Sequence, residues 1–585
     1  MLHPLHGKAL LDVPLACGKQ RECWPGSPTW SADSRHVYFT LRTPGQHSHS
    51  IYSAATDGGE PLKVLDFDGT IVDLRMMPDG RLAMLATPAA RKESGATEAA
   101  APLAGDLDET PPVQRLAVLD HGSLQWLSPP EWYVYEYDWL PGGRIFVGTA
   151  ASGDGDANWW LARLYQFVGE AQPPRAIYTP TDIHQQLAHP RVSPDGRTVA
   201  FIAGIMSDFG LTGGDVYTLP IAGGSATNLT PGMLASATSL SWGCSGHLLV
   251  AFLAGDSTQL TDLGLPGAPQ SRVLWSAAET LAGDEALLST ACKPGLTATV
   301  HESFTQPPEI AVGPIGQWHD ITTANSGLSS HAQVRSLQWV SDRFNVQGWL
   351  LLPENVRGKL PLVTLVHGGP AGAALPYFSG PGLAESLLER GYALLRPNPR
   401  GSYGQGERFT LANYRDFGHG DLRDILAGID AAEKAAPIDD ARLGITGGSY
   451  GGFMTMWAVT QTRRFKAAVA AAGISNWISY YGENGIDTWM LPYFGASAYN
   501  DPAVYARSSA INFITQARTP TFAYVGERDL ECPAPQTLEF WRALKSQGVP
   551  AAIMIYPGEG HSLRDPEHVA DALARTLQWF DRYLR

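Results

Sequence analysis

Residues 444–456 read GITGGSYGGFMTM and place one serine, Ser449, among four glycines. A strand-type run precedes this group, and an apolar helical pattern follows it from about Phe453. A strand that turns sharply into a helix comes close to neighbouring backbone, so small residues are needed on both sides of the turn and the serine projects from it. The N-terminus of the helix also favours developing negative charge. The stretch predicts a nucleophile elbow with Ser449 as the nucleophile.

A serine hydroxyl is a weak nucleophile, and it needs a base that takes its proton and an acid that orients the base. Around such an elbow the chain order is serine, acid, histidine, with the last two on loops after later strands. Asp529 lies just beyond one predicted strand, and His561 lies beyond the next. Asp565 follows His561 and so breaks the order, while His568 lies within the final helical pattern. We therefore predict a triad of Ser449, Asp529 and His561.

The tetrahedral intermediate of acyl transfer requires two N–H donors for its oxyanion. The residue after the nucleophile, Tyr450, supplies one in this kind of site, and the loop after an early strand supplies the other. Residues 366–372 read VHGGPAG and form that loop, and we predict Gly369 as the second donor. The alternative is a simple Gly-Pro turn.

The region around the elbow alternates short apolar strands with amphipathic helices. Strands are predicted within residues 360–369, 391–401, 442–448, 465–475, 519–526 and 551–558, and helices over residues 422–436 and 568–584. This alternation is typical of a mostly parallel sheet covered on both faces. It predicts an α/β-hydrolase domain over residues 331–585, with the reactive loops at the carboxyl ends of the strands.

The first 330 residues instead repeat a short phrase, in which a turn is followed by an alternating or apolar strand. The copies read SADSRHVYF, MPDGRLAML, LPGGRIFVG, SPDGRTVAF, CSGHLLVAF and a degraded KPGLTATV. Their anchors are Asp33, Asp79, Gly142, Asp195, Ser245 and Pro294, which are 46, 63, 53, 50 and 49 residues apart. A period near 50 residues gives about four strands per copy, as in one blade of a β-propeller.

We predict an all-β propeller of seven blades over residues 1–330, with the first 20 or so residues unassigned. The alternative, a pair of β-sandwiches, gives no reason for the repeat. The longest interval contains residues 86–112, whose Ala, Pro and charge-rich composition predicts a loop inserted between strands. Residues 215–231 carry a Gly-Gly turn between two alternating runs and predict a hairpin.

Composition excludes several classes of protein. The 585 residues are 44% hydrophobic and 17% charged, with a formal charge of -15 and a pI near 5.5. An acidic chain is a poor partner for nucleic acid or an anionic membrane, and no run approaches the roughly 18 apolar residues of a membrane span. The N-terminal sequence lacks a basic leader and a small-residue cleavage site, which predicts a cytoplasmic protein.

The cysteines and histidines indicate neither a cross-linked scaffold nor a metal site. The cysteines are few, odd in number and scattered, and they are Cys17, Cys23, Cys244, Cys292 and Cys532. This pattern is unlike a disulfide framework or a zinc site. His47 and His49 have no further ligands nearby, so we interpret their segment as a solvated loop. We expect no metal and no cofactor.

The ordered motifs HGGP, NPRGSYGQG, GGSYGG, GERDLECPAPQ and GEGH follow a propeller-like repeat. Together they resemble the prolyl oligopeptidase family of serine peptidases, and within it the acylaminoacyl-peptidase branch. The resemblance covers nearly the whole chain. It implies cleavage of short peptides, with the propeller shielding the active site from folded proteins. It also implies a triad of Ser449, Asp529 and His561 and an oxyanion hole of Gly369 and Tyr450.

One position departs from that branch, where many members carry an arginine two residues after the acid. This chain has Glu531 instead. If its carboxylate points into the site, it should attract a free α-amino group and repel a terminal carboxylate, which favours aminopeptidase-like cleavage. The alternative is that Glu531 is solvated or pairs with Arg528.

Aromatic residues gather in residues 474–489, after the strand that follows the elbow. By position they are candidates for the walls of the specificity pocket, with plain packing as the alternative. These candidates are Trp477, Tyr480, Tyr481 and Trp489.

Three classes of function remain. The first is a serine peptidase of short peptides, for which aminopeptidase-like, acylaminoacyl-peptidase and carboxypeptidase activities stay open. The second is a serine esterase or amidase of a non-peptide substrate. The third is a propeller-based binding protein with a lapsed active site. The intact triad and both oxyanion motifs favour an enzyme.

Overall fold

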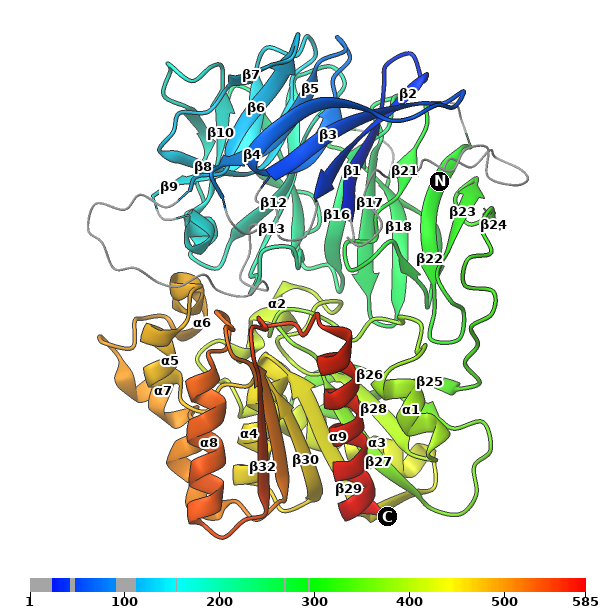
Figure 1. Ribbon diagram of the computed structural model, residues 1–585, viewed down its shortest axis with the longest axis vertical. Helices are drawn as coiled ribbons and strands as arrows, with labels where there is room; N and C mark the ends of the chain where they lie inside the picture. The colour runs from blue at the N-terminus through cyan, green and yellow to red at the C-terminus, as the bar shows by residue number, and fades with distance from the viewer. Residues whose placement is uncertain (1–23, 43–47, 91–111, 154, 268–269, 293–294) are drawn as a thin grey trace.

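The computed structural model describes residues 24–42, 48–90, 112–153, 155–267, 270–292 and 295–585. These residues form two domains stacked on each other, an all-β domain followed by a mixed α/β domain (Figure 1). The last strand of the first domain ends at Asp320, and the first strand of the second begins at Gln333. Within the described part of the chain, no helix is both long enough and apolar enough to cross a membrane.

The all-β domain consists of antiparallel four-stranded units in chain order, and the first two units share one long strand. The shared sheet runs β1 (Trp24–Trp30), β2 (His36–Arg42), β3 (Ser48–Ala55), β4 (Leu62–Met76), β5 (Leu82–Pro88), β6 (Arg115–Asp120) and β7 (Ser123–Trp126). The third unit contains β8 (Trp132–Trp139), β9 (Phe146–Ser152), β10 (Arg163–Phe167) and β11 (Arg175–Tyr178). The fourth contains β12 (Gln186–Val192), β13 (Thr198–Gly204), β14 (Asp215–Pro220) and β15 (Thr227–Asn228).

The last two units complete this domain. The fifth contains β16 (Ser236–Trp242), β17 (Leu248–Ala254), β18 (Ser257–Leu263) and β19 (Arg272–Ala277). The sixth contains β20 (Thr280–Leu281), β21 (Ser289–Thr290), β22 (Thr297–Glu302), β23 (Glu309–Gly313) and β24 (His319–Asp320). The arrangement confirms the predicted propeller-like domain. It also confirms the hairpin within residues 215–231, where β14 pairs with β15.

The repeated phrase is a turn between strands, and its chemistry explains why it recurs. The first five copies join the first and second strands of their units. In three of them an aspartate carboxylate accepts the N–H two residues further on, at 3.1–3.2 Å. These aspartates are Asp33, Asp79 and Asp195. A carboxylate that satisfies a backbone donor in this way fixes a tight turn.

The described residues of the first domain form six units. Residues 1–23 lie outside the described part of the chain, so the count of seven blades stays a prediction. The connection between Asp320 and Gln333 builds no strand. The predicted insertion falls between β5 and β6, but its residues 91–111 lie outside the described part of the chain.

The second domain is built on one eight-stranded sheet, which confirms the predicted hydrolase fold. Its spatial order is β25 (Gln333–Ser341), β26 (Phe344–Leu352), β28 (Ala393–Asn398), β27 (Leu360–Val366), β29 (Ile438–Gly448), β30 (Phe465–Ala471), β31 (Thr521–Gly526) and β32 (Ala551–Tyr556). All strand pairs from β28 to β32 are parallel, while β25 and β26 are antiparallel. Parallel strands place the loops after β27, β29, β31 and β32 at one edge, toward the propeller (Figure 1).

Helices cover both faces of this sheet. One face packs against α1 (Leu383–Glu389) and α9 (Pro566–Leu584). The other packs against α3 (Gly420–Ala435), α4 (Tyr450–Gln461) and α8 (Ala534–Ser546). The shorter helices α2 (Glu407–Thr410), α5 (Trp477–Glu483), α6 (Leu491–Phe494) and α7 (Pro502–Arg507) lie nearer the propeller (Figure 1).

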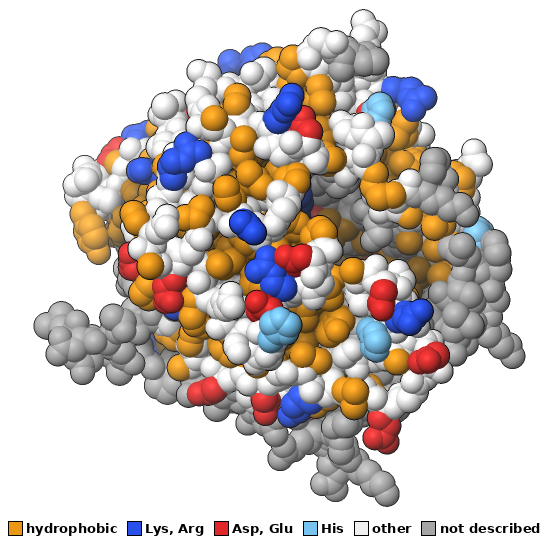
Figure 2. Space-filling view, turned by 90° about the horizontal axis from the view of Figure 1, so that it is seen from above, with side chains coloured by type: hydrophobic (Ala, Val, Ile, Leu, Met, Phe, Trp, Pro, Cys, Tyr) orange, Lys and Arg blue, Asp and Glu red, His pale blue; other side chains and the backbone are white. Residues whose placement is uncertain are grey.

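Charged side chains of both signs lie on the outer face of the propeller. Figure 2 shows basic and acidic side chains interspersed with apolar ones among the described residues of this face. Such a mixed surface is unlike the basic stripe with which proteins bind nucleic acid. The exclusion of nucleic acid as a partner stays a prediction.

The interpretation of His49 is wrong. His49 is not in a solvated loop, because it is buried in β3 and its Nδ1 lies 3.1 Å from the backbone of Ile71. His47 lies outside the described residues. The described residues contain no group of three or more potential metal ligands.

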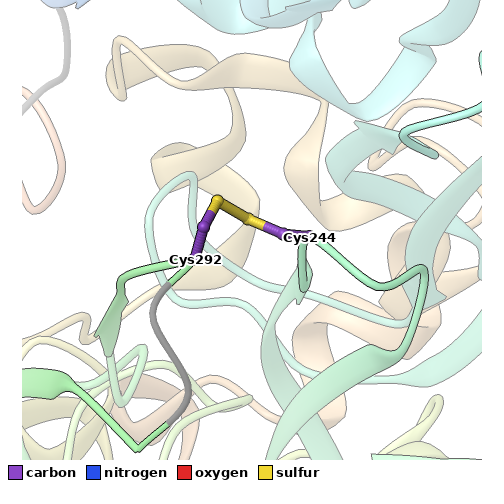
Figure 3. The surroundings of a disulfide bond; sticks show 2 residues. All are labelled: Cys244 and Cys292. Carbon is purple, nitrogen blue, oxygen red and sulfur yellow. A yellow bond between two sulfur atoms is a disulfide. The ribbon is translucent and has the colours of Figure 1, made fainter.

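The cysteines also differ from the prediction, because Cys244 and Cys292 form a disulfide (Figure 3). They occupy equivalent places in the fifth and sixth copies of the phrase, 48 residues apart. The bond therefore joins neighbouring units of the propeller. Disulfides are typical of oxidising compartments, and this one does not favour the predicted cytoplasmic location. That location stays a prediction.

The disulfide should stabilise the propeller by closing a long loop. Replacing both residues, Cys244→Ser and Cys292→Ser, should lower the free energy of unfolding by about 2–4 kcal/mol. Thermal unfolding of the double variant and the wild type measures this, with Cys532→Ser as a control for loss of a buried thiol. Peptide mapping without reductant should recover the two cysteines in one linked fragment. Separate fragments, or equal melting temperatures, would contradict the assignment.

Candidate active site

Ser449 sits in a strained turn between β29 and α4, one residue after the strand and one before the helix. Its φ of 57° and ψ of -122° are unfavourable for a residue with a Cβ. The neighbouring chain leaves no room there. A Cβ on Gly451 would lie 2.2 Å from the carbonyl oxygen of Val366, and one on Gly452 would lie 2.3 Å from that of Ala471. The glycines are thus required by close backbone approach.

The structure brings the predicted acid and base together. Asp529 follows β31 and His561 follows β32, and the Nδ1–H of His561 donates to Oδ2 of Asp529 at 2.8 Å. The other oxygen, Oδ1, accepts the backbone N–H groups of Glu531 (2.9 Å) and Cys532 (2.8 Å). The Asp529 carboxylate is fully buried. It is therefore held rigidly, in the position of the group that orients the base.

Ser449 and His561 line one cavity of about 460 Å³, whose remaining wall is largely apolar. The Ser449 hydroxyl is in hydrogen-bonding contact with the thiol of Cys532, a buried free cysteine. The Nε2 atom of His561 lies 3.3 Å from Oε2 of Glu531. The nitrogen that has to accept the serine proton is therefore engaged by a carboxylate.

This contact changes the protonation of the site. Burial alone lowers the pKa of His561, but the hydrogen bond that His561 donates to Asp529 and the charges of Asp529, Glu531 and Asp208 outweigh it and raise that pKa to about 9. Burial raises the pKa of Glu531, and the charge of His561 opposes the rise. The imidazole of the unliganded site is consequently protonated near neutral pH.

A second, narrow pocket lies on the other side of Ser449. Its walls include both predicted oxyanion residues and three of the four predicted aromatic residues, namely Gly369, Tyr450, Trp477, Tyr480 and Trp489. The fourth, Tyr481, is not a wall residue, because it packs edge-on against Tyr499 and Tyr505. Tyr481 lies on α5, and its ring faces these two tyrosines and not the pocket. The order of residues in the sequence did not show which way this side chain points.

Tyr450 is fixed by a residue that sequence analysis missed. Its hydroxyl donates to Oδ2 of Asp421 at 2.5 Å, and the same oxygen accepts the N–H of Gly418 at 3.1 Å. Burial raises the pKa of Asp421 to about 7. This bond anchors the residue whose N–H is the predicted oxyanion donor. The sequence contains no motif that announces it.

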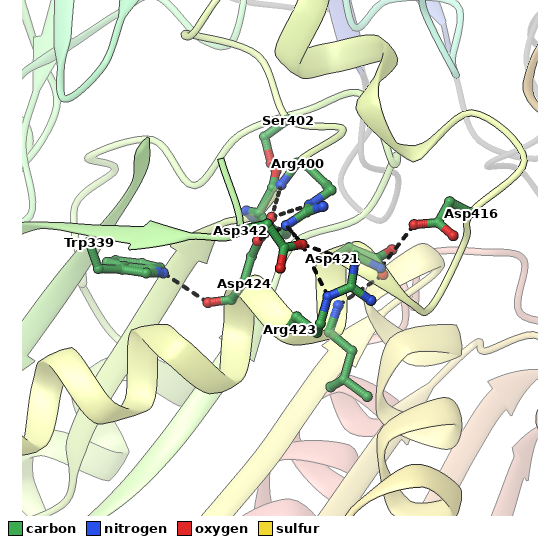
Figure 4. Close-up of polar contacts among 11 residues, drawn as sticks. Trp339, Asp342, Arg400, Ser402, Asp416, Asp421, Arg423 and Asp424 are labelled. Atoms are coloured by element: carbon green, nitrogen blue, oxygen red, sulfur yellow. Dashed lines mark hydrogen bonds and ion pairs between the residues drawn. The ribbon is translucent and has the colours of Figure 1, made fainter. Parts of the chain in front are cut away.

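A buried ion pair supports the loop after β28, in the NPRGSYGQG motif. Arg400 binds both oxygens of Asp424 at 2.5 and 2.8 Å, and it reaches Asp342 at 2.9 Å (Figure 4). Farther along this loop, the hydroxyl of Ser402 is hydrogen-bonded to Nε2 of His367 at 2.8 Å. The loop therefore braces residues 366–372, which contain Gly369.

The propeller also contributes to the site, which sequence analysis did not foresee. Ser207 lies in the loop between β13 and β14, and its hydroxyl contacts the N–H (3.0 Å) and the carbonyl oxygen (3.3 Å) of Ala371. The next residue, Asp208, is half-buried and lines the narrow pocket together with Ser449 and Glu531. Burial and the charge of Glu531 raise the pKa of Asp208 to about 7.

Comparison with known proteins relates the second domain to a family. Residues 380–585, about a third of the chain, match the model of the "Prolyl oligopeptidase family". Over these residues the α/β domain is similar to this family of serine peptidases. The chain is 35% identical over 295 residues to the Bacillus subtilis protein named "Uncharacterized peptidase YuxL", which is 48% of this chain and 44% of that protein. It is 29% identical over 304 residues to the "Acylamino-acid-releasing enzyme" of Mus musculus, covering 48% of this chain and 41% of that enzyme.

The matched regions span about half the length of these curated relatives. A solved structure, the acylaminoacyl peptidase of Pyrococcus horikoshii, resembles the chain with a TM-score of 0.75 at 21% identity. That likeness covers 96% of this chain and 89% of the other. It shows that an all-β domain and an α/β domain arranged as in this chain occur together in a solved structure.

The charges around His561 predict an alkaline pH profile. Only the neutral imidazole accepts the serine proton, so kcat/KM should rise with pH through an apparent pKa near 9. Glu531→Gln removes a negative charge that faces Nε2 and should move this pKa toward the ordinary value of about 6.5. Rates from pH 5 to 10 measure the shift. Glu567→Gln, an exposed position on α9, should leave the profile in place. Identical profiles for both variants would contradict the proposed charge coupling.

Proposed function

We propose that the chain is a serine peptidase that hydrolyses short peptides through Ser449, Asp529 and His561. The observation that carries this proposal is the 2.8 Å hydrogen bond from His561 to buried Asp529, next to a serine on a strained strand-to-helix turn. The family of the catalytic domain and the names of its relatives support it.

The chemistry follows from these positions. Oγ of Ser449 attacks the scissile carbonyl carbon while Nε2 of His561 takes its proton, and Asp529 stabilises the imidazolium. The oxyanion accepts hydrogen bonds from the N–H groups of Gly369 and Tyr450. His561 then gives the proton to the leaving amine, and the peptide C–N bond breaks. Water, activated by the same imidazole, hydrolyses the acyl-enzyme and restores Ser449.

The propeller restricts which substrates reach Ser449. Its loop over residues 205–214 is bonded to the catalytic domain at several points. Tyr403 donates its hydroxyl proton to the carbonyl oxygen of Leu211 at 2.8 Å, and Glu407 accepts the N–H of Ile205 at 3.2 Å. Entry therefore requires a narrow route or an opening of the two domains. Short peptides fit such a constraint, while folded proteins do not.

The assignment of the nucleophile is testable with an active-site probe. A fluorophosphonate should label the wild type on Ser449, and Ser449→Ala should abolish both labelling and peptide hydrolysis. His561→Ala should lower kcat by about 10⁴-fold or more, because triad residues act as a unit. The melting temperatures of the variants control for folding. Activity at the wild-type level in either variant would rule out the triad.

Size selection should be evident in the products. We expect peptides of a few residues to be cleaved and casein to be spared, because a long chain cannot pass the propeller loop at residues 205–214. Mass spectrometry of a peptide panel of increasing length measures the limit. Casein degraded as readily as a tetrapeptide would show that the propeller does not restrict access.

A further inference from the structure

The pocket next to Ser449 holds two acidic side chains that peptide hydrolysis itself does not require. Glu531 follows β31 in the catalytic domain, and its side chain is buried. Asp208 comes from the propeller loop between β13 and β14. Both line the pocket that also contains Ser449 and Gly369. Two domains thus place one carboxylate each beside the nucleophile.

The backbone holds both acids in place. The N–H of Glu531 donates to the catalytic Asp529, and the residue before Asp208 is bonded to Ala371 in the oxyanion loop. The backbone positions of both acids are therefore fixed beside the pocket. A buried carboxylate needs a cationic or hydrogen-bonding partner, since its desolvation is costly.

In the described structure the positive charge acting on both acids is that of His561. Oε2 of Glu531 lies 3.3 Å from Nε2 of the imidazole, while Asp529 occupies Nδ1 at 2.8 Å. Two carboxylates thus contact one imidazole, and the charge of Asp208 also acts on it. Catalysis requires Nε2 to be neutral and turned to Ser449, so Glu531 has to be drawn away from it first. A second cation in the pocket would do this.

We propose that Glu531 and Asp208 together bind the free α-amino group of a short peptide, and that this contact frees Nε2 of His561 for catalysis. The inference rests on the proposed peptidase function and names its substrate class as peptides with an unblocked N-terminus, cleaved within one or two residues of it. The ammonium group keeps its protons and pairs with the two carboxylates. The imidazole, no longer paired with Glu531, releases its proton to solvent.

The lining of the pocket favours an α-amino group over a basic side chain. Beyond the two acids the pocket walls are mainly apolar or aromatic, and include Ile474, Trp477 and Trp489. The pocket is narrow, at about 20 Å³, so a peptide N-terminus enters it only when the side chains around it move. The residue that carries the amino group then meets apolar walls. Consecutive residues advance by about 3.3–3.6 Å, so an amino group one or two residues from the scissile bond stays within reach of the acids.

Acylation of the N-terminus should therefore weaken the substrate. It removes the positive charge and leaves Glu531 on Nε2 of His561. A charge-assisted hydrogen bond of this kind corresponds to roughly a 10- to 100-fold difference in kcat/KM. The chain would then differ in preference from enzymes that release acylated amino acids.

The test compares phenylalanyl 4-nitroanilide and alanyl-phenylalanyl 4-nitroanilide with their N-acetylated forms. Of the two free-amine substrates, the one that the wild type cleaves faster should exceed its own N-acetylated form by about 10- to 100-fold in kcat/KM. Glu531→Gln and, independently, Asp208→Asn should both reduce this ratio, chiefly by raising KM for the free amine. Glu567→Gln should keep it. Because Asp208 lies in the other domain, it provides a second variant if Glu531→Gln fails to fold.

A pH profile separates this role from a merely structural one. With the free-amine substrate, the acid limb of kcat should lie at lower pH than that of kcat/KM, because the bound ammonium frees His561 from Glu531. With the acetylated substrate the two limbs should coincide. If Glu531 had only a structural role, the acid limbs of kcat and kcat/KM would coincide for the free-amine substrate as well.

Several outcomes would overturn the inference. One is a wild type that prefers the acetylated substrates, and another is a ratio unchanged in both variants. A third is acetyl-lysyl 4-nitroanilide cleaved better than acetyl-phenylalanyl 4-nitroanilide, with the preference lost in Glu531→Gln, which would assign the acids to a basic side chain. In each case labelling of Ser449 by the fluorophosphonate, together with hydrolysis of unblocked or blocked peptides that Ser449→Ala abolishes, would leave the peptidase function standing. Loss of that labelling in the wild type would instead overturn the function itself.

Discussion

The imidazole of His561 lies between carboxylates, and the chemistry of the site depends on how they share its charge. Asp529 on Nδ1 is the partner that a serine nucleophile requires, because it orients the base. Glu531 on Nε2 is different, because it competes with Ser449 for the same nitrogen. The unliganded site therefore holds its base protonated, and a substrate must change the balance of charge before it reacts. Binding and activation are linked through one nitrogen atom.

That balance involves both domains. The propeller loop over residues 205–214 is pinned to the oxyanion loop by Ser207 and brings Asp208 into the pocket. The propeller is thus more than a cover over the catalytic domain, because it supplies one of the charges that act on His561. This arrangement also explains why the contacts between the domains are hydrogen-bonded and specific. A loosely docked propeller would not hold Asp208 at a fixed place beside Glu531.

Local chemistry made much of the fold predictable from sequence. The propeller repeat was recognisable because Asp33, Asp79 and Asp195 each close the same kind of turn. The nucleophile elbow was recognisable because close approach of neighbouring backbone requires glycine at residues 451 and 452. Contacts between distant segments were not predictable. No local pattern places Asp208 beside Glu531 or Asp421 beneath Tyr450. The disulfide between Cys244 and Cys292 had a signal in the sequence, because the two cysteines are 48 residues apart, close to the period of the repeat.

The most direct measurement of the central claim is a crystal structure of Ser449→Ala with a bound tripeptide whose N-terminus is free. The account predicts that the α-amino nitrogen lies within hydrogen-bonding distance of both Glu531 and Asp208, and that Nε2 of His561 no longer contacts Glu531 but faces the position of the missing serine hydroxyl. A peptide whose amino group points to solvent, with Glu531 still on Nε2, would contradict it.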